Sequence, residues 1–175
     1  VYDLYDSKDL RKNTFFMNAH IDCGSGHTAD DVYMLSKFPG NPNLKKDPSE
    51  YSYYNMIKIF RSPEAYLISA EARYREGDDA GAQSVLNELR RARGETSTAS
   101  TGDKLFDDIK DEWFSEFIGE GFRLDCLKRW GDGFTRHDPQ NTNVLIISDP
   151  STYTNLTVTS DNKRFVWEIP TNDRK

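Results

Sequence analysis

Cysteine is scarce in this chain of 175 residues, and the two that are present form no motif. Cys23 and Cys126 lie far apart, so their spacing indicates neither a disulfide framework nor a zinc-binding site. The sequence also lacks any stretch approaching the roughly 18 apolar residues of a membrane-spanning helix. These absences exclude a disulfide-stapled scaffold and a spanning helix as the basis of the fold.

An excess of basic residues is missing as well. Lys and Arg number 23 against 29 Asp and Glu, which gives a net charge of -6. Because binding to a phosphate backbone requires a basic surface, nucleic acid is not an expected partner. The sequence contains neither a Gly-rich phosphate loop followed by Lys nor a G-x-S-x-G serine elbow. We therefore expect no cofactor.

One short stretch contains side chains that could ligate a metal: His20, Asp22, Cys23 and His27. Their spacing fits no zinc or iron template. The preferred interpretation is a loop in which His and Cys occur incidentally, and no metal site is predicted.

The most informative feature present is the segment 111–130, DEWFSEFIGEGFRLDCLKRW. Glu112, Glu116 and Glu120 follow one another at four-residue spacing, so on a helix they share a face and repel one another unless cations neutralise them. Seven candidate cations lie in this and preceding segments: Arg61, Arg90, Arg91, Arg93, Arg123, Lys128 and Arg129. A solvated acidic face is the alternative. We favour a structural Glu/Arg network joining packed helices, with Arg123 neutralising Glu116 and Glu120.

Residues 62–94 predict two helices joined by a short turn. Ser62 is expected as N-cap and Pro63 as the first helical residue, and Asp78 restarts a second helix that Gly94 ends. Helices joined by so short a turn lie antiparallel. The small residues and the central Gly are typical of a tetratricopeptide hairpin, and one such hairpin cannot cover its own apolar face.

The chain after this hairpin predicts a loop, a buried helix and a shorter helical segment. The small polar run 95–102 is expected to be mobile. A helix from about residue 103 is apolar over more than half its circumference, Gly119 and Gly121 interrupt it, and a further segment covers 122–130. Two extended pieces are expected, at 144–148 and 164–170. Residues 1–60 mix apolar positions with polar loops.

Four segments follow one another along the chain: LYDSKDLRKNTFF, with Asp9 and Arg11 in a D-x-R arrangement, FRSPEAYLISAEARYREGDDAGAQSVLNELRRARG, DEWFSEFIGEGFRLDCLKRWG and RFVWEIPTND. In this order they resemble blocks of the SusD/RagB family of outer-membrane nutrient-binding lipoproteins. They extend over nearly the whole chain. The resemblance is therefore much more specific than an isolated motif.

The resemblance implies an all-α, mainly helical fold with tetratricopeptide-like hairpins, long loops and a few short strands. Residues 1–175 would be the C-terminal part of a SusD-like domain, including the 62–94 hairpin and the 103–131 helical segment, with the N-terminal half and the lipid-attachment segment absent. It further implies a lipid-anchored protein on the cell outer membrane that delivers a nutrient to a TonB-dependent, SusC-like transporter.

Ligand binding is a better expectation than catalysis. The three glutamates lie beside cations that would lower their pKa values, which does not suit a general acid, so no catalytic residue is predicted. Tyr51, Tyr53 and Tyr54 are the densest aromatic group in a polar stretch, as an oligosaccharide site requires. Alternatively, they cap the apolar side of the helix near Ser62. The alternative function is a tetratricopeptide-type scaffold for a protein or peptide.

Overall fold

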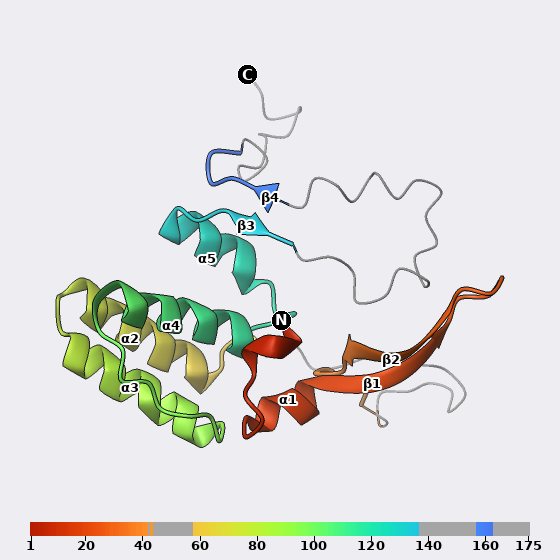
Figure 1. Ribbon diagram of the computed structural model, residues 1–175. Coiled ribbons are helices and arrows are strands. Elements are labelled where there is room, and N and C mark those ends of the chain that lie inside the picture. The colour runs from red at the N-terminus through yellow and green to blue at the C-terminus, as the bar shows by residue number, and fades with distance from the viewer. Residues whose placement is uncertain (42, 44–57, 137–156, 163–175) are drawn as a thin grey trace. The chain divides into compact units, whose positions relative to one another are not determined.

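The structure is a computed structural model that describes residues 1–41, 43, 58–136 and 157–162 (Figure 1). Most regular structure in these residues is helical, which confirms the expected mainly α-helical fold. The chain divides into two compact units, considered separately below. The first comprises Val1–Ala19 and Tyr33–Gly119, and the second His20–Val32 and Glu120–Lys175.

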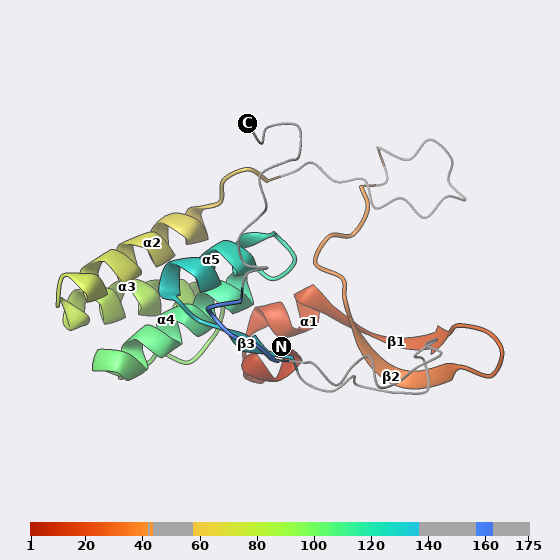
Figure 2. The ribbon, with the colours of Figure 1, turned by 90° about the horizontal axis from the view of Figure 1, so that it is seen from above.

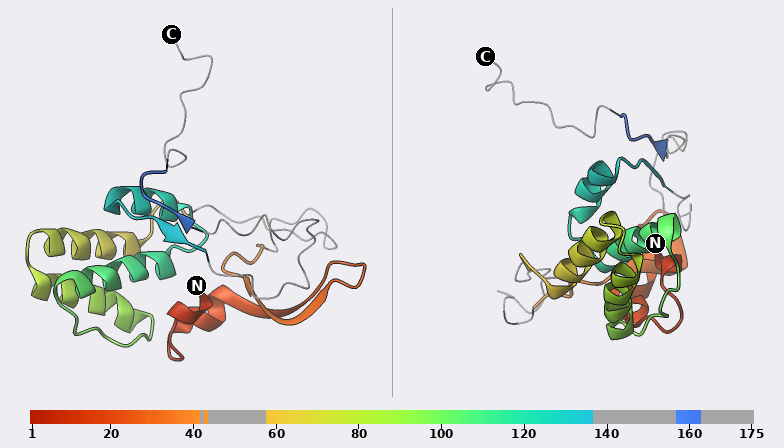
Figure 3. Two further views of the ribbon diagram at one scale, coloured as in Figure 1. Left: turned by 45° about the horizontal axis from the view of Figure 1, so that its top comes forward. Right: turned by 90° about the vertical axis from the view of Figure 1, so that its left-hand side faces the viewer.

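Three helices form the core of the first unit: α2 (Ser62–Arg75), α3 (Asp79–Ala92) and α4 (Gly102–Glu116). They lie side by side in Figures 1 and 2, and the right-hand view of Figure 3 shows them from one end. Each packs against the other two. Their buried apolar side chains are Leu67, Ala70, Ala82, Leu86, Leu89, Leu105, Ile109 and Trp113.

The α2–α3 turn confirms the predicted hairpin, with one correction at its start. Gly77 has φ 81°, and the Asp78 backbone N–H donates to the Arg73 carbonyl at 2.9 Å, which closes α2. The Asp78 carboxylate then accepts from the Gly81 N–H at 2.9 Å and caps α3. The N-cap of α2 is Arg61 rather than Ser62, because Arg61 has the extended backbone that precedes the first turn.

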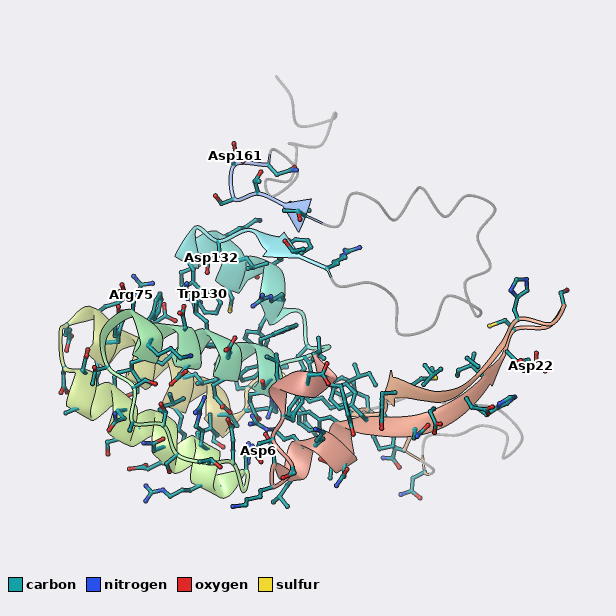
Figure 4. The ribbon with its side chains drawn as sticks, viewed as in Figure 1. Asp6, Asp22, Arg75, Trp130, Asp132 and Asp161 are labelled. Atoms are coloured by element: carbon teal, nitrogen blue, oxygen red, sulfur yellow. The ribbon has the colours of Figure 1, made fainter. Side chains whose placement is uncertain are left out.

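The segment 95–101 is tethered, contrary to the expectation of a mobile loop. Thr98 exchanges two hydrogen bonds with the Asn87 side chain, at 2.9 and 2.7 Å, and its hydroxyl donates to Asp108 at 2.5 Å. The Thr96 N–H and hydroxyl both donate to Asp6, which Figure 4 labels. The small polar residues here form hydrogen bonds with side chains of neighbouring elements rather than with water. Composition alone does not reveal this.

The N-terminal residues form elements that the sequence did not predict. A 3-10 helix, η1 (Tyr2–Leu4), precedes α1 (Leu10–Phe15), and the strands β1 (Phe16–Asp22) and β2 (Thr28–Leu35) pair as a hairpin. These strands give no clear sequence signal, because apolar and polar residues alternate only incompletely along them.

Besides the His20–Val32 part of the β1–β2 hairpin, the described part of the second unit contains one helix and a small sheet. The helix α5 (Phe122–Trp130) lies between Gly121 and Gly131, which both have positive φ, at 89° and 70°. The strands β3 (Phe134–Thr135) and β4 (Thr157–Val158) pair antiparallel. The extended pieces predicted at 144–148 and 164–170 lie outside the described residues.

Candidate functional site

Helix α4 places Glu112 and Glu116 one turn apart on one face, and each is only 1% exposed. The expected row of three glutamates ends here. The helix stops at Glu116, and Gly119 follows with φ 77°, so Glu120 does not continue the same face. Spacing alone predicted the face correctly for two residues and wrongly for the third.

Arg11 occupies the centre of the charged side chains that meet this face. Its Nη1 lies 2.5 Å from Glu112 Oε1 and 3.1 Å from Glu116 Oε2. Its Nη2 lies 2.8 Å from Asp9 Oδ2 and 2.7 Å from Glu95 Oε2. The guanidinium is buried and uses its planar fork to bind four carboxylates from three parts of the chain.

The D-x-R spacing has a direct structural explanation. The Asp9 carboxylate accepts the Arg11 N–H at 2.8 Å, which caps α1, and it also binds the Arg11 guanidinium. The Leu10 N–H donates to the Arg93 carbonyl at 2.9 Å, so α1 begins against the end of α3. Gly94 permits this approach, since a Cβ there would lie 2.8 Å from the Lys8 carbonyl oxygen.

Three arginines bind Glu116. In addition to Arg11, Arg61 Nη1 lies 2.6 Å from Oε1 and Arg93 Nε lies 2.9 Å from Oε2. Arg90 Nε lies 3.4 Å from Glu112 Oε2 and 3.5 Å from Glu95 Oε1. We call this group the Arg11 cluster: Asp9, Arg11, Arg61, Arg90, Arg93, Glu95, Glu112 and Glu116. It confirms the predicted Glu/Arg network for three of the candidate cations, Arg61, Arg90 and Arg93.

The remaining candidate cations have other surroundings. Arg91 is exposed and its Nε donates to the Asn87 carbonyl at 3.1 Å. Arg123, Lys128 and Arg129 are exposed residues of α5 in the second unit. For Glu116 the expectation of Arg123 as partner is corrected, because Arg11, Arg61 and Arg93 hold that carboxylate. A pairing of Arg123 with Glu120 stays a prediction.

The electrostatics of the cluster keep Glu116 and Arg11 charged. Burial would raise the pKa of Glu116, but the hydrogen bonds from Arg93 and Arg61 outweigh it and lower the pKa to about 2. Burial would also lower the pKa of Arg11, and its bonds to Asp9 and Glu112 raise it instead. A carboxylate that stays ionised at neutral pH is unsuited to be a general acid. The arrangement joins helices and offers no reactive group at Glu116.

Side chains from neighbouring segments also bind the backbone carbonyls at the C-terminal end of α4. Lys37 Nζ donates to the Glu116 carbonyl at 2.6 Å, and Arg61 Nη2 donates to the same oxygen at 3.0 Å. These cations lie where the carbonyls of α4 lack intrahelical partners and where the helix dipole is negative. The buried Tyr5 hydroxyl donates to the Ser115 carbonyl at 2.7 Å, and burial raises the pKa of Tyr5.

The residues predicted to bind ligand, Tyr51, Tyr53 and Tyr54, lie outside the described residues. His20 and Asp22 belong to β1, and Figure 4 shows Asp22 near the far end of the hairpin. His20 Nδ1 lies 2.7 Å from Asp30 Oδ1. Across the described ranges, no three His, Cys, Asp or Glu side chains gather as a metal site would require.

One group of aromatic side chains was not predicted from the sequence. The rings of Tyr2 and Tyr33 stack with their centroids 3.9 Å apart, and Lys12 Nζ lies 4.6 Å from the centroid of Tyr2. Tyr2 also meets Phe16 edge to face. The aromatic content of the N-terminal residues was the feature that could have indicated this group. Pairing Tyr2 with Tyr33, however, requires knowledge of the β1–β2 hairpin.

Comparison with known proteins decides the family. The model of the SusD family matches residues 3–174. The chain belongs to the SusD family. It is 41% identical over 75 residues to the starch-binding protein SusD of Bacteroides thetaiotaomicron, an alignment that covers 43% of this chain and 13% of that protein. The alignment thus spans a small part of this relative's length, and no solved structure matches the chain.

In this SusD-family chain, three of the four segments that carry the family resemblance converge on the Arg11 cluster, and the fourth, RFVWEIPTND, lies outside the described residues. The D-x-R segment supplies Asp9 and Arg11, the hairpin segment supplies Arg61, Arg90 and Arg93, and the α4 segment supplies Glu112 and Glu116. Motifs that are separated in the sequence therefore describe one buried structure. Their role here is to join the helices.

Proposed function

We propose that the protein containing this chain binds an oligosaccharide nutrient at the cell surface and delivers it to a TonB-dependent outer-membrane transporter without cleaving it. The observation that carries the proposal is the SusD-family match over residues 3–174. Because one relative is a starch-binding protein, SusD of Bacteroides thetaiotaomicron, starch-type glucans are the first ligands to test.

Tyr51, Tyr53 and Tyr54 are the proposed ligand-binding residues. They lie in the stretch YSYYN, where Ser52 and Asn55 add hydroxyl and amide groups. A sugar ring presents C–H groups to an aromatic face and hydroxyls to planar polar groups, so this composition suits an oligosaccharide. Such contacts are shallow and hydrated, which favours an affinity between about 1 μM and 1 mM.

The proposed location is the outer surface of the outer membrane, with anchoring through an N-terminal lipid. A SusC-like transporter is the proposed protein partner. Among the described residues, no helix is long and apolar enough to span a membrane. The proposal of a lipid anchor and a transporter partner rests on family membership.

The test is titration of the intact protein with a panel of oligosaccharides that begins with maltooligosaccharides. We expect saturable binding, which Tyr53→Ala combined with Tyr54→Ala weakens at least tenfold. Tyr66→Ala is the matched control, because Tyr66 is a tyrosine of α2 that is 40% exposed. Release of reducing ends by purified protein would contradict the non-catalytic proposal. Unchanged affinity in the double variant would exclude these tyrosines as the site.

A protein- or peptide-binding scaffold is the second candidate, favoured by the α2–α3 hairpin. Such scaffolds bind on surfaces formed by several stacked hairpins. Screening the same protein against a peptide library distinguishes the two functions. Saturable peptide binding, with no response to any oligosaccharide, would replace the first proposal with this one.

A further inference from the structure

The Glu95 and Glu112 carboxyl groups compete for the same two arginines. Glu95 Oε2 lies 2.7 Å from Arg11 Nη2, and Glu112 Oε1 lies 2.5 Å from Arg11 Nη1. On the other side, both carboxyl groups lie near Arg90 Nε, at 3.5 and 3.4 Å. Two acidic groups from different elements therefore occupy one buried site.

Arg90 neutralises the negative charge of Glu95 and Glu112 only in part. Its two contacts are longer than a strong N–H···O hydrogen bond, and its buried Nε has no hydrogen-bond partner among the described residues. Arg11 is shared with two further carboxylates, those of Asp9 and Glu116. The cations nearest to Glu95 are thus divided among several acids.

Charged groups from every neighbouring element face this site. The segment at α1 contributes Asp9 and Arg11, the end of α3 contributes Arg90 and Arg93, α4 contributes Glu112 and Glu116, and the start of α2 contributes Arg61. Arg61 and Arg93 are bound to Glu116, so they add little to the compensation of Glu95. The side chain of Glu95 is 14% exposed, which leaves its proton exchangeable with solvent.

We propose that the Glu95–Glu112 pair holds one proton in the folded protein at neutral pH, and that loss of this proton in mildly alkaline solution loosens the attachment of the segment 95–101. A shared proton converts the repulsion between two buried carboxylates into a hydrogen bond. Glu95 is the first residue of that segment, so repulsion from Glu112 acts directly on its anchoring point. The inference is independent of the proposed ligand.

The direction of the pKa shift supports this geometry. Burial, followed by the charge of Glu112 and a hydrogen bond to it, raises the pKa of Glu95 to about 8, although Arg90 and Arg11 oppose the shift. The ordinary value is 4.5. Because the folded-state pKa is raised, the associated stability is present in full below pH 4.5 and is lost progressively as the pH rises to about 8.

The test compares urea unfolding of the intact protein and its Glu95→Gln variant between pH 5.5 and pH 9. The ratio of the wild-type unfolding equilibrium constant to that of the variant should rise with pH, by up to about tenfold per pH unit. Above about pH 8 this ratio should stay constant. Glu112→Gln should also flatten the profile, since it removes the neighbouring charge. Glu76→Gln, at an exposed position, should keep the wild-type profile. Superimposable profiles for wild type and Glu95→Gln would overturn the proposal.

Hydrogen exchange provides a measurement that needs no variant. After correction for the intrinsic pH dependence of exchange, amides of the segment 95–101 should lose protection above about pH 8, while those of α2 keep theirs. Protection of the segment that is constant from pH 6 to pH 9 would contradict the loosening directly.

Discussion

The two ends of α4 carry the same kinds of ion pair in opposite surroundings. Toward its start, Lys104 binds Asp108 at 2.9 Å, with 67% of the lysine side chain exposed. Toward its end, Glu112 and Glu116 are buried among arginines from three other segments. Water competes with the first pair and is excluded from the second. Burial and the number of partners, rather than the presence of an ion pair, decide what each contributes.

The largest effect is expected from Arg11→Met. This change leaves several carboxylates buried with fewer cations, and the free energy of unfolding should fall by about 3 to 5 kcal/mol. Chemical denaturation at pH 7 provides the measurement. Arg73→Met is the control, because Arg73 pairs with Asp78 at 2.8 Å with side chains that are 47% and 45% exposed, and it should cost at most about 1 kcal/mol. Equal losses in the two variants would remove the distinction between the buried and exposed pairs.

A second prediction concerns the free energy of unfolding at acidic pH. The pKa of Glu116 lies at about 2 in the folded protein and ordinarily at 4.5. Since the folded-state pKa is lowered, the stability it provides is present above pH 4.5 and is lost as the pH falls toward 2. The shift corresponds to about 3 kcal/mol at about 1.4 kcal/mol per pKa unit. Urea unfolding between pH 5 and pH 2.5 should show wild type and Glu116→Gln converging, and a constant difference would contradict it.

Glycine substitutions sharpen the comparison at the backbone level. Gly77 and Gly94 both end helices with positive φ, at 81° and 74°. A Cβ at Gly77 meets nothing within 4 Å, whereas one at Gly94 would lie 2.8 Å from the Lys8 carbonyl oxygen. Gly77→Ala should therefore cost about 1 kcal/mol, and Gly94→Ala about 1 to 3 kcal/mol more. Melting temperatures of both variants provide the check, and equal values would show that the α1–α3 junction is not tight.

The smallest effect is expected from Lys104→Met. The pair with Asp108 joins residues four apart on one helix and its lysine is mostly exposed. Asp108 keeps its hydrogen bond from the Thr98 hydroxyl when the lysine is removed, so the change should cost well under about 1 kcal/mol. The difference should shrink further in about 1 M salt, where the Debye length is about 3 Å. A loss comparable to that of Arg11→Met would mean that exposure does not separate the two ends of α4.

The sequence predicted the helices well because each carries a long periodic signal. The 62–94 hairpin and the interruption at Gly119 and Gly121 follow from apolar spacing and glycine, and the structure confirms them. The β1–β2 hairpin gave no comparable signal. An isolated two-stranded hairpin is only marginally stable, so its formation depends on packing against other parts of the chain.

The Arg11 cluster could be predicted only in part. Four-residue spacing placed Glu112 and Glu116 together, but it cannot indicate which arginines of other segments reach them. The resemblance marked Asp9 and Arg11 without giving their role, and the central position of Arg11 depends on the approach of α1 to the end of α3. The tyrosines proposed to bind ligand stay a prediction.

The central claim is that Arg11 and the glutamates of α4 act as one coupled structural unit. A double-mutant cycle with Arg11→Met, Glu112→Gln and the combined variant tests it, using the free energy of unfolding at pH 7. We predict a coupling energy of about 2 kcal/mol or more, because each partner is buried and depends on the other. A coupling below about 0.5 kcal/mol would show that the two residues contribute independently and would contradict the account.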